Sequence, residues 1–303
     1  MVQQQFQVVQ GYYTVPRPPC PRLRTLDGVE GRGDRELCKT HWLNGDEGAD
    51  EREGNRAAGA GGMKETCAFW SGHANSSAMV LRMIELKQSP DFVVHACTRA
   101  EFDFVYDFME KFQKMCEVEI VMEDVVATKP HMGFESFFNK PWCKGNHIGE
   151  IHGMPFKTTA CWHRRNVKDP VYRKWAARCS ETYTGFHVKE RHRVYNSALS
   201  TTRYPLIEWG WTDKDSIDYL RKRGIPHAAY DTFGFERLGC WFCPKQSDTA
   251  LFIVYKNRPD MFQQMLDMEE NSPHGFRPGK SLKDLVDIWE SKPNYDLKRW
   301  CKV

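Results

Sequence analysis

Apolar residues from Thr66 onward fall into short runs and helical stripes that alternate along the chain. Short apolar runs bounded by polar residues are typical of buried strands, and we expect strands at 66–70, 92–97, 118–122 and 183–188. Between the first three runs, residues 78–86 and 102–115 repeat apolar side chains at helical spacing. Strands separated by helices of this length predict βαβ units, and so an α/β fold with a parallel sheet and flanking helices.

The last part of the chain has a mainly helical pattern. Thr212, with Asp215 three residues later, predicts the start of a helix that ends at Gly224. Helical spacing also covers 250–270 and 282–290, whereas residues 129–180 are rich in aromatic side chains and turn formers and predict no definite element. We therefore expect an α/β domain over residues 63–245 and a mainly helical extension over 246–303.

Residues 1–62 differ from the rest of the chain in composition. They hold eight Lys and Arg, nine Asp and Glu, and nine glycines between Gly28 and Gly62, with no apolar period. Such a stretch cannot bury enough apolar surface to offset its ordering entropy, so the composition predicts disorder. Two interpretations stay open: a flexible tail with an unknown partner, or sequence upstream of a native start at Met63.

Composition and charge narrow the class of protein. No apolar run approaches the roughly 20 residues that cross a bilayer, so we expect no membrane span. The net charge of +3 is too small to indicate a nucleic-acid scaffold. Eleven cysteines without a secretory pattern at the N-terminus favour a cytoplasmic protein, because clustered thiols in a reducing compartment hold metal or do redox chemistry more often than they form disulfides.

The segment after the first strand has the composition of an anion-binding loop. It reads Ser71-Gly72-His73-Ala74-Asn75-Ser76-Ser77, and a helix follows it. Small residues let backbone N–H groups approach a phosphate, and the N-terminus of a helix adds its dipole. The alternative is an ordinary strand–turn–helix in which Ser and Asn serve as N-caps.

This loop resembles the PP-loop of the adenine nucleotide alpha-hydrolase superfamily, in the branch of phosphoadenosine phosphosulfate (PAPS) reductase-like proteins. The motif of that family is Ser-Gly-Gly-x-Asp-Ser. The chain keeps Ser71, Gly72 and Ser76, whereas His73 stands in place of the family's second Gly and Asn75 in place of its Asp. Asn75 keeps the shape of that Asp and loses its charge.

Further landmarks follow in the order that the family has them. They are the turn with Thr98 and Glu101, the stretch 161–170, the segment with Gly185, Glu190 and Arg193, the segment 203–215, and Gly239-Cys240-Trp241-Phe242-Cys243-Pro244. The last of these resembles a motif of iron–sulfur or phage-encoded members. Together the landmarks span residues 66–245.

The resemblance implies a Rossmann-like sheet that binds ATP or another adenine nucleotide, with Mg²⁺ as its companion ion, beyond the carboxyl ends of the strands. The loop 71–77 would then face the phosphates, and Thr98 and Glu101 would lie beside the adenosine. The candidate catalytic residues in this part of the chain are Asn75, Glu190 and Arg193. A guanidinium there suits sulfate or phosphate because it is a planar fork of donors.

Cys240 and Cys243 form the tightest cysteine pair in the chain. Cys143 and Cys161 add two thiols upstream, and four thiolates suit either structural zinc or a [4Fe–4S] cluster. The resemblance favours the cluster over zinc. Two buried apolar cysteines at a turn are the alternative, and one of the neighbouring histidines could replace a thiol as ligand: His147, His152 or His163.

Three functions are consistent with the sequence. The first is an enzyme that cleaves ATP between its α- and β-phosphates and adenylates a substrate for sulfur or related group transfer. The second is a thiol-dependent sulfonucleotide reductase with Cys301 as the nucleophile. The third is a non-catalytic subunit that binds a nucleotide in an altered loop.

The acceptor substrate and the oligomeric state stay open at this point. A basic neighbourhood could hold an anionic acceptor, either a nucleic acid or a nucleotide, and its residues are Lys144, Arg164, Arg165 and Lys168. A solvated charged face is the alternative. A homo-oligomer is compatible with the pattern.

Overall fold

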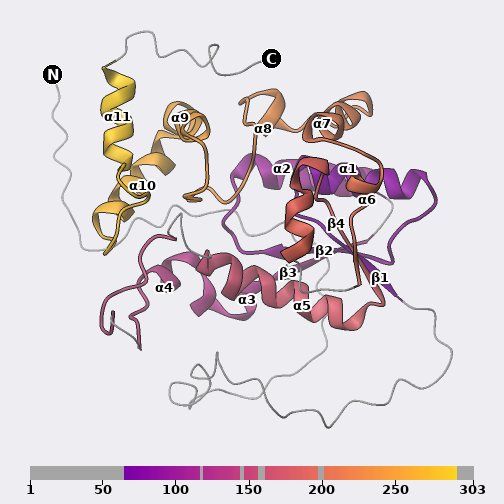
Figure 1. The fold of residues 1–303 in the computed structure, drawn as a ribbon, viewed down its shortest axis with the longest axis horizontal. Coiled ribbons are helices and arrows are strands. Elements are labelled where there is room, and N and C mark those ends of the chain that lie inside the picture. The colour runs from indigo at the N-terminus through magenta and orange to yellow at the C-terminus, as the bar shows by residue number, and fades with distance from the viewer. Residues whose placement is uncertain (1–64, 117–118, 144–146, 156–160, 197–200, 292–303) are drawn as a thin grey trace.

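A five-stranded parallel sheet forms the centre of the described structure (Figure 1). The computed structural model describes residues 65–116, 119–143, 147–155, 161–196 and 201–291. The strands are β1 (Thr66–Phe69), β2 (Phe92–Cys97), β3 (Ile120–Asp124), β4 (Glu181–Thr184) and β5 (Thr202–Arg203). They follow the order β3-β2-β1-β4-β5, and every neighbouring pair is parallel. The predicted α/β fold with a parallel sheet is confirmed.

The strand order places a topological switch point beside β1. The chain builds β2 and β3 on one side of β1 and then returns to build β4 and β5 on the other side. Phe69, at the end of β1, lies opposite Val94 of β2 and Thr184 of β4. The connections that leave β1 and β4 start side by side, and ligands of open α/β sheets bind in the crevice at such a point.

Helices cover both faces of the sheet (Figure 1). On one face lie α1 (Ala74–Glu85), α2 (Asp103–Met115), α6 (Pro205–Glu208) and α7 (Asp213–Lys222). On the other lie α3 (Val125–Thr128), α4 (Phe134–Phe138) and α5 (Asp169–Arg178). The shorter elements are η1 (Pro130–Met132), η2 (Arg164–Lys168), η3 (Val188–Asn196) and α8 (Ala228–Asp231). The stretch 129–180, for which the pattern predicted nothing definite, therefore contains several helical elements.

The helices form where local sequence and burial agree. The apolar stripe of α2 is buried through Phe104, Val105, Phe108, Met109 and Phe112, because residues three and four apart share one face of a helix. The predicted start of α7 is confirmed as a capping box, in which Thr212 and Asp215 exchange side-chain and backbone hydrogen bonds.

Several predicted elements have different bounds: α1 begins at Ala74 instead of residue 78, and β3 ends at Asp124 instead of residue 122. The helix expected over 250–270 is two helices, α9 (Asp248–Asn257) and α10 (Pro259–Glu270), because Pro259 has no N–H to continue α9 and instead begins α10. The strand expected at 183–188 is β4, which begins earlier at Glu181 and ends at Thr184. The Thr182 hydroxyl is buried there, 2.8 Å from the hydroxyl of Thr202, so a polar residue is satisfied inside the sheet.

The C-terminal part is helical, as predicted, and ends in α11 (Leu282–Glu290). None of the helices in the described ranges has the length and apolar character that crossing a membrane would require. The predictions for residues 1–62 lie outside the described residues.

Candidate functional site

The loop 71–77 is folded back on itself by hydrogen bonds between its own residues. The Ser71 N–H donates to Ser76 Oγ (3.1 Å), and the two hydroxyls of this pair are 2.9 Å apart. Ser77 Oγ donates to the carbonyl of His73 (2.8 Å) and accepts from Trp70 Nε1 (2.8 Å). The N-cap of α1, His73, makes no side-chain cap. The Tyr230 hydroxyl is bonded to the backbone N–H of Ala74, so this first turn is contacted by a neutral side chain and has no acidic residue. A helix N-terminus without a carboxylate beside it is a common position for an anion.

Two glycines bring backbone segments close to this loop. Gly72 has φ +75°, a conformation that favours glycine, and a Cβ there would be 2.9 Å from Met109. Gly185 follows β4, and a Cβ on it would be 2.9 Å from Cα and 3.0 Å from N of Ser76. The end of β4 thus lies directly against the first turn of α1, and no larger residue fits between them.

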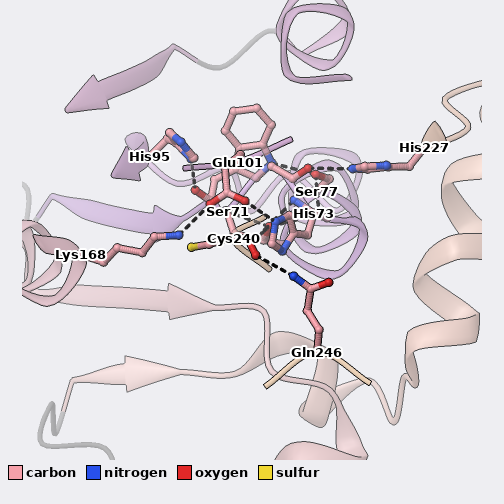
Figure 2. A network of polar contacts seen from close by, with 12 residues as sticks. Ser71, His73, Ser77, His95, Glu101, Lys168, His227, Cys240 and Gln246 are labelled. Atoms are coloured by element: carbon pink, nitrogen blue, oxygen red, sulfur yellow. Dashed lines mark hydrogen bonds and ion pairs between the residues drawn. The ribbon is translucent and has the colours of Figure 1, made fainter. Parts of the chain in front are cut away.

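A buried ion pair links the loop to the rest of the site (Figure 2). Glu101 is 2% exposed, and its carboxylate accepts from Lys168 Nζ (2.7 Å) and lies 3.3 Å from Nε2 of His73. Burial alone would raise the pKa of Glu101, but Lys168 and His73 outweigh it and hold that pKa well below its usual value. Glu101 is therefore a buried carboxylate that stays ionised at neutral pH.

The thiol turn lies next to this ion pair. Burial opposes the charge on Lys168, but Cys240 and Glu101 are close enough to keep its pKa well above the usual value. The Trp241 N–H donates to the carbonyl of Ala100 (3.0 Å), and Gln246 Nε2 donates to the carbonyls of Cys240 and Trp241 (3.0 Å each). These bonds attach residues 240–243 to the turn that carries Glu101.

Two neutral histidines bond to backbone carbonyls of the loop and of the residue before it. His95 Nδ1 donates to the carbonyl of Trp70 (2.9 Å), and His227 Nε2 donates to the carbonyl of Gly72 (3.0 Å) while its ring stacks on Phe108. Burial lowers the pKa of both rings to about 4. His95 and His227 were not among the predicted site residues; a buried polar side chain in an apolar strand was the signal for His95.

The other side of the loop is a second polar cluster. Asn75 Nδ2 donates to Asp213 Oδ1 (2.5 Å), and Asp213 Oδ2 is 3.1 Å from Nε2 of His187. The same His187 nitrogen is 3.4 Å from Glu190, which also pairs with Arg193. The structure therefore brings together three predicted catalytic residues, Asn75, Glu190 and Arg193, and adds His187 and Asp213, which sequence reasoning missed.

The remaining predicted residues have different surroundings. Thr98 is 2% exposed, and its hydroxyl has no hydrogen-bond partner among the described residues. Ala74 is buried in the first turn of α1. Cys301 lies outside the described residues, so its predicted role as a nucleophile stays a prediction.

Three of the four predicted metal ligands, Cys161, Cys240 and Cys243, lie close enough together to affect the pKa of Cys240. Burial raises the pKa of the Cys240 thiol, with smaller contributions from Cys243 and Cys161, and Lys168 opposes it. Cys143 is exposed, and its thiol donates to the carbonyl of Pro141 (3.7 Å). As arranged here, no group of three or more His, Cys, Asp or Glu in the described ranges could hold a metal ion. The four-cysteine centre stays a prediction.

The chain is similar to known proteins over its sheet domain. The sequence model of the phosphoadenosine phosphosulfate reductase domain matches residues 66–246. An uncharacterised protein of Methanocaldococcus jannaschii is 26% identical over 213 residues, which cover 66% of this chain and 49% of that protein. The chain thus spans about half the length of this curated relative. A crystal structure of phosphoadenylyl-sulfate (PAPS) reductase from Candida auris, in a phosphate complex, is 15% identical with a TM-score of 0.42, and the match covers 59% of this chain and 82% of that chain.

Proposed function

Because the chain belongs to the phosphoadenosine phosphosulfate reductase domain family, we propose that it is an enzyme that binds ATP at the loop 71–77 and adenylates an acceptor. The observation that carries the proposal is the continuous polar path from the loop through Glu101 and Lys168 to Cys240 (Figure 2). The site thus combines a phosphate-binding loop, a buried cation and a thiol turn. This combination suits a reaction that activates one group and transfers another.

The proposed step has defined bonds. A nucleophilic atom of the acceptor forms a bond to the α-phosphorus of ATP, and the bond from that phosphorus to the oxygen bridging to the β-phosphorus breaks. Pyrophosphate leaves with the electron pair, and Mg²⁺, when bound, would balance its negative charge. The N-terminus of α1 supports the proposal, because it has no acidic residue in its first turn and its dipole favours the negative charge of the phosphates.

The chain's own residues have separate roles in this proposal. Lys168 provides a positive charge that stays in place, because Glu101 fixes it at 2.7 Å. His227 holds the carbonyl of Gly72 and so keeps the loop backbone oriented. Gly185 leaves room for the loop to approach β4. None of these roles requires movement of the sheet.

Calorimetric titration with ATP tests the loop assignment. Replacing Ser76 by Ala should weaken ATP binding by about tenfold, since one hydrogen bond in the loop is worth about 1 kcal/mol or slightly more. Ser216→Ala is the matched control: Ser216 is also buried, but its hydroxyl donates to the carbonyl of Thr212, so its bond lies within the start of α7 and not in the loop. Equal affinity in wild type and Ser76→Ala, or no ATP binding at all, would contradict the proposal.

The products of the reaction distinguish adenylation from the two alternative functions, sulfonucleotide reduction and nucleotide binding without catalysis. Release of pyrophosphate from ATP supports adenylation. Release of sulfite from PAPS, without pyrophosphate from ATP, would replace the proposal by sulfonucleotide reduction. Binding of ATP with neither product, in the presence of candidate acceptors, would favour a nucleotide-binding subunit.

A further inference from the structure

The positive charge of the protein is concentrated in one part of the chain. Residues 161–196 hold nine Lys and Arg against three Asp and Glu, a net charge of +6, whereas the whole chain has +3. The remaining residues are therefore negative overall. This segment includes η2, α5 and η3, and two of its side chains, Lys168 and Glu190, are part of the candidate site. The basic charge and the site thus share the same elements.

Most arginines in the part of the chain that the structure describes are paired with a neighbouring carboxylate. Of the fourteen arginines in the described ranges, ten form ion pairs with Asp or Glu. Four are exposed and have no ion pair or side-chain hydrogen bond with any other described residue: Arg165, Arg173, Arg191 and Arg237. Pairing is thus common among the described arginines, and these four keep guanidinium donors that no described carboxylate occupies.

Three of these four arginines lie beside the site. Arg165 is in η2, three residues before Lys168, and Arg191 is in η3, next to Glu190. Arg237 precedes the thiol turn and is near enough to Cys243 to oppose the rise in the pKa of that thiol, which burial causes. We call these three arginines, together with the exposed Lys189 of η3, the basic rim.

The basic rim has the chemistry of a surface that contacts several phosphates. Its members come from three separate segments, and each of these segments also contributes a residue to the site: Lys168, Glu190 or Cys240. A single nucleotide in the loop 71–77 would occupy the N-terminus of α1 but would not account for exposed guanidiniums on three segments. A guanidinium fork matches a phosphate in two parallel hydrogen bonds.

We propose that the acceptor is a nucleic acid strand, whose backbone phosphates contact the basic rim while one of its nucleotides reaches the loop 71–77. This inference rests on the proposed function, because it names the substrate class that the adenylation would act on. Charge complementarity is the argument: a strand carries regularly spaced phosphates, and unpaired arginines on adjacent segments match such a ligand better than a compact anion.

Fluorescence anisotropy with a labelled single-stranded oligonucleotide of about 20 residues tests the proposal, with salt varied from about 50 to about 200 mM. The triple variant Arg165→Gln, Arg191→Gln, Arg237→Gln should bind at least about tenfold more weakly at low salt. Its slope of log affinity against log salt should fall in magnitude by about 2, since each phosphate contact contributes about 0.7 in a single strand.

A charge-matched variant serves as the control. Arg82→Gln, Arg203→Gln and Arg221→Gln remove three positive charges from exposed arginines that are already paired with carboxylates. This control should keep the affinity and the salt slope of the wild type, and thermal unfolding of both triple variants shows whether each is folded. Equal losses in the two variants would overturn the proposal, because they would show an effect of net charge alone.

Two further outcomes keep the inference separate from the proposed function. If wild type binds ATP but no oligonucleotide at low salt, the inference fails and the ATP proposal stands. If an acidic peptide competes as well as the oligonucleotide at equal charge, the acceptor is an acidic protein surface instead, and the inference also fails. If wild type binds the oligonucleotide through the rim but no ATP, the rim is a nucleic-acid site and the adenylation proposal is wrong.

Discussion

At the scale of single residues, the contact between Asn75 and Asp213 sets the charge balance of the loop. Asn75 occupies the position at which the family motif has Asp, and it donates to Asp213 at the start of α7. The carboxylate that the loop lacks is thus present at the same place, supplied by another element. The sequence alone could not indicate this pair, because the two residues are 138 positions apart.

Restoring the family's Asp by itself should harm the protein. Asn75→Asp would place two carboxylates about 2.5 Å apart in a partly buried site and should weaken ATP binding by about tenfold or more, because like charges at this distance repel strongly. Asn75→Asp combined with Asp213→Asn exchanges the two side chains and should recover most of the affinity. Calorimetric titration of ATP into the three variants measures the difference.

The exchange has a clear negative outcome. If Asn75→Asp alone binds ATP as well as the double variant does, the side chains at 75 and 213 do not interact in the nucleotide complex. The matched control is Asp215→Asn, which changes a neighbouring carboxylate of the same helix that caps α7 and does not contact Asn75. This control should leave ATP affinity within about twofold of wild type.

At the scale of elements, the sequence predicted those whose signal is local. Strands β1 and β2, helices α1 and α2 and the start of α7 depend on apolar runs, helical spacing and a capping box, and each is present. β4 and the break before α10 depend on other information. Thr182 is acceptable inside a sheet only because Thr202 lies beside it, and that partner comes from a separate strand.

The thiol turn 240–243, together with Cys161 before η2 and Cys143, would hold the predicted metal centre. We predict that protein purified without oxygen is brown and contains iron and sulfide, each at about four per chain. Cys240→Ser with Cys243→Ser should abolish both, whereas Cys179→Ser, which changes a buried cysteine at the end of α5, should keep them. Stoichiometric zinc without iron would refute the cluster, and no metal at all would refute the four-cysteine prediction.

At the scale of the whole molecule, the position of the site followed from topology more than from any motif. The landmarks named the loop, the 97–101 turn and the thiols in sequence order, but the strand order β3-β2-β1-β4-β5 decides which of them meet. Lys168 was noted within the landmark 161–170 and as part of a basic neighbourhood, but its bond to Glu101, 67 positions earlier, could not be predicted from either. His187, Asp213 and His227 were missed, since no local pattern distinguishes them from surface residues.

The stability of the whole molecule should fall on mild acidification because of its buried neutral histidines. His95 and His227 have pKa values of about 4 in the folded protein, because burial disfavours the imidazolium, against an ordinary value of 6.5. Between these values the unfolded chain binds more protons than the native one. The free energy of unfolding is therefore highest above about pH 6.5 and falls as the pH drops towards 4, by about 2 kcal/mol per histidine between about pH 7 and about pH 5.

Urea unfolding at several pH values isolates the contribution of one ring. His227 is held in its neutral form by two bonds, Nε2–H to the carbonyl of Gly72 and Nδ1 from the N–H of Ala229. His227→Gln should have a lower free energy of unfolding at pH 7 than wild type, because the stacking on Phe108 is lost. Between about pH 7 and about pH 5, its free energy of unfolding should fall by about 2 kcal/mol less than that of wild type. His147→Gln, at an exposed position, should fall in parallel with wild type. If the free energies of unfolding of His227→Gln and wild type depended on pH in the same way, protonation of His227 would not limit the stability of the loop. The support of the loop would then have to be assigned to His95 and the serine hydrogen bonds.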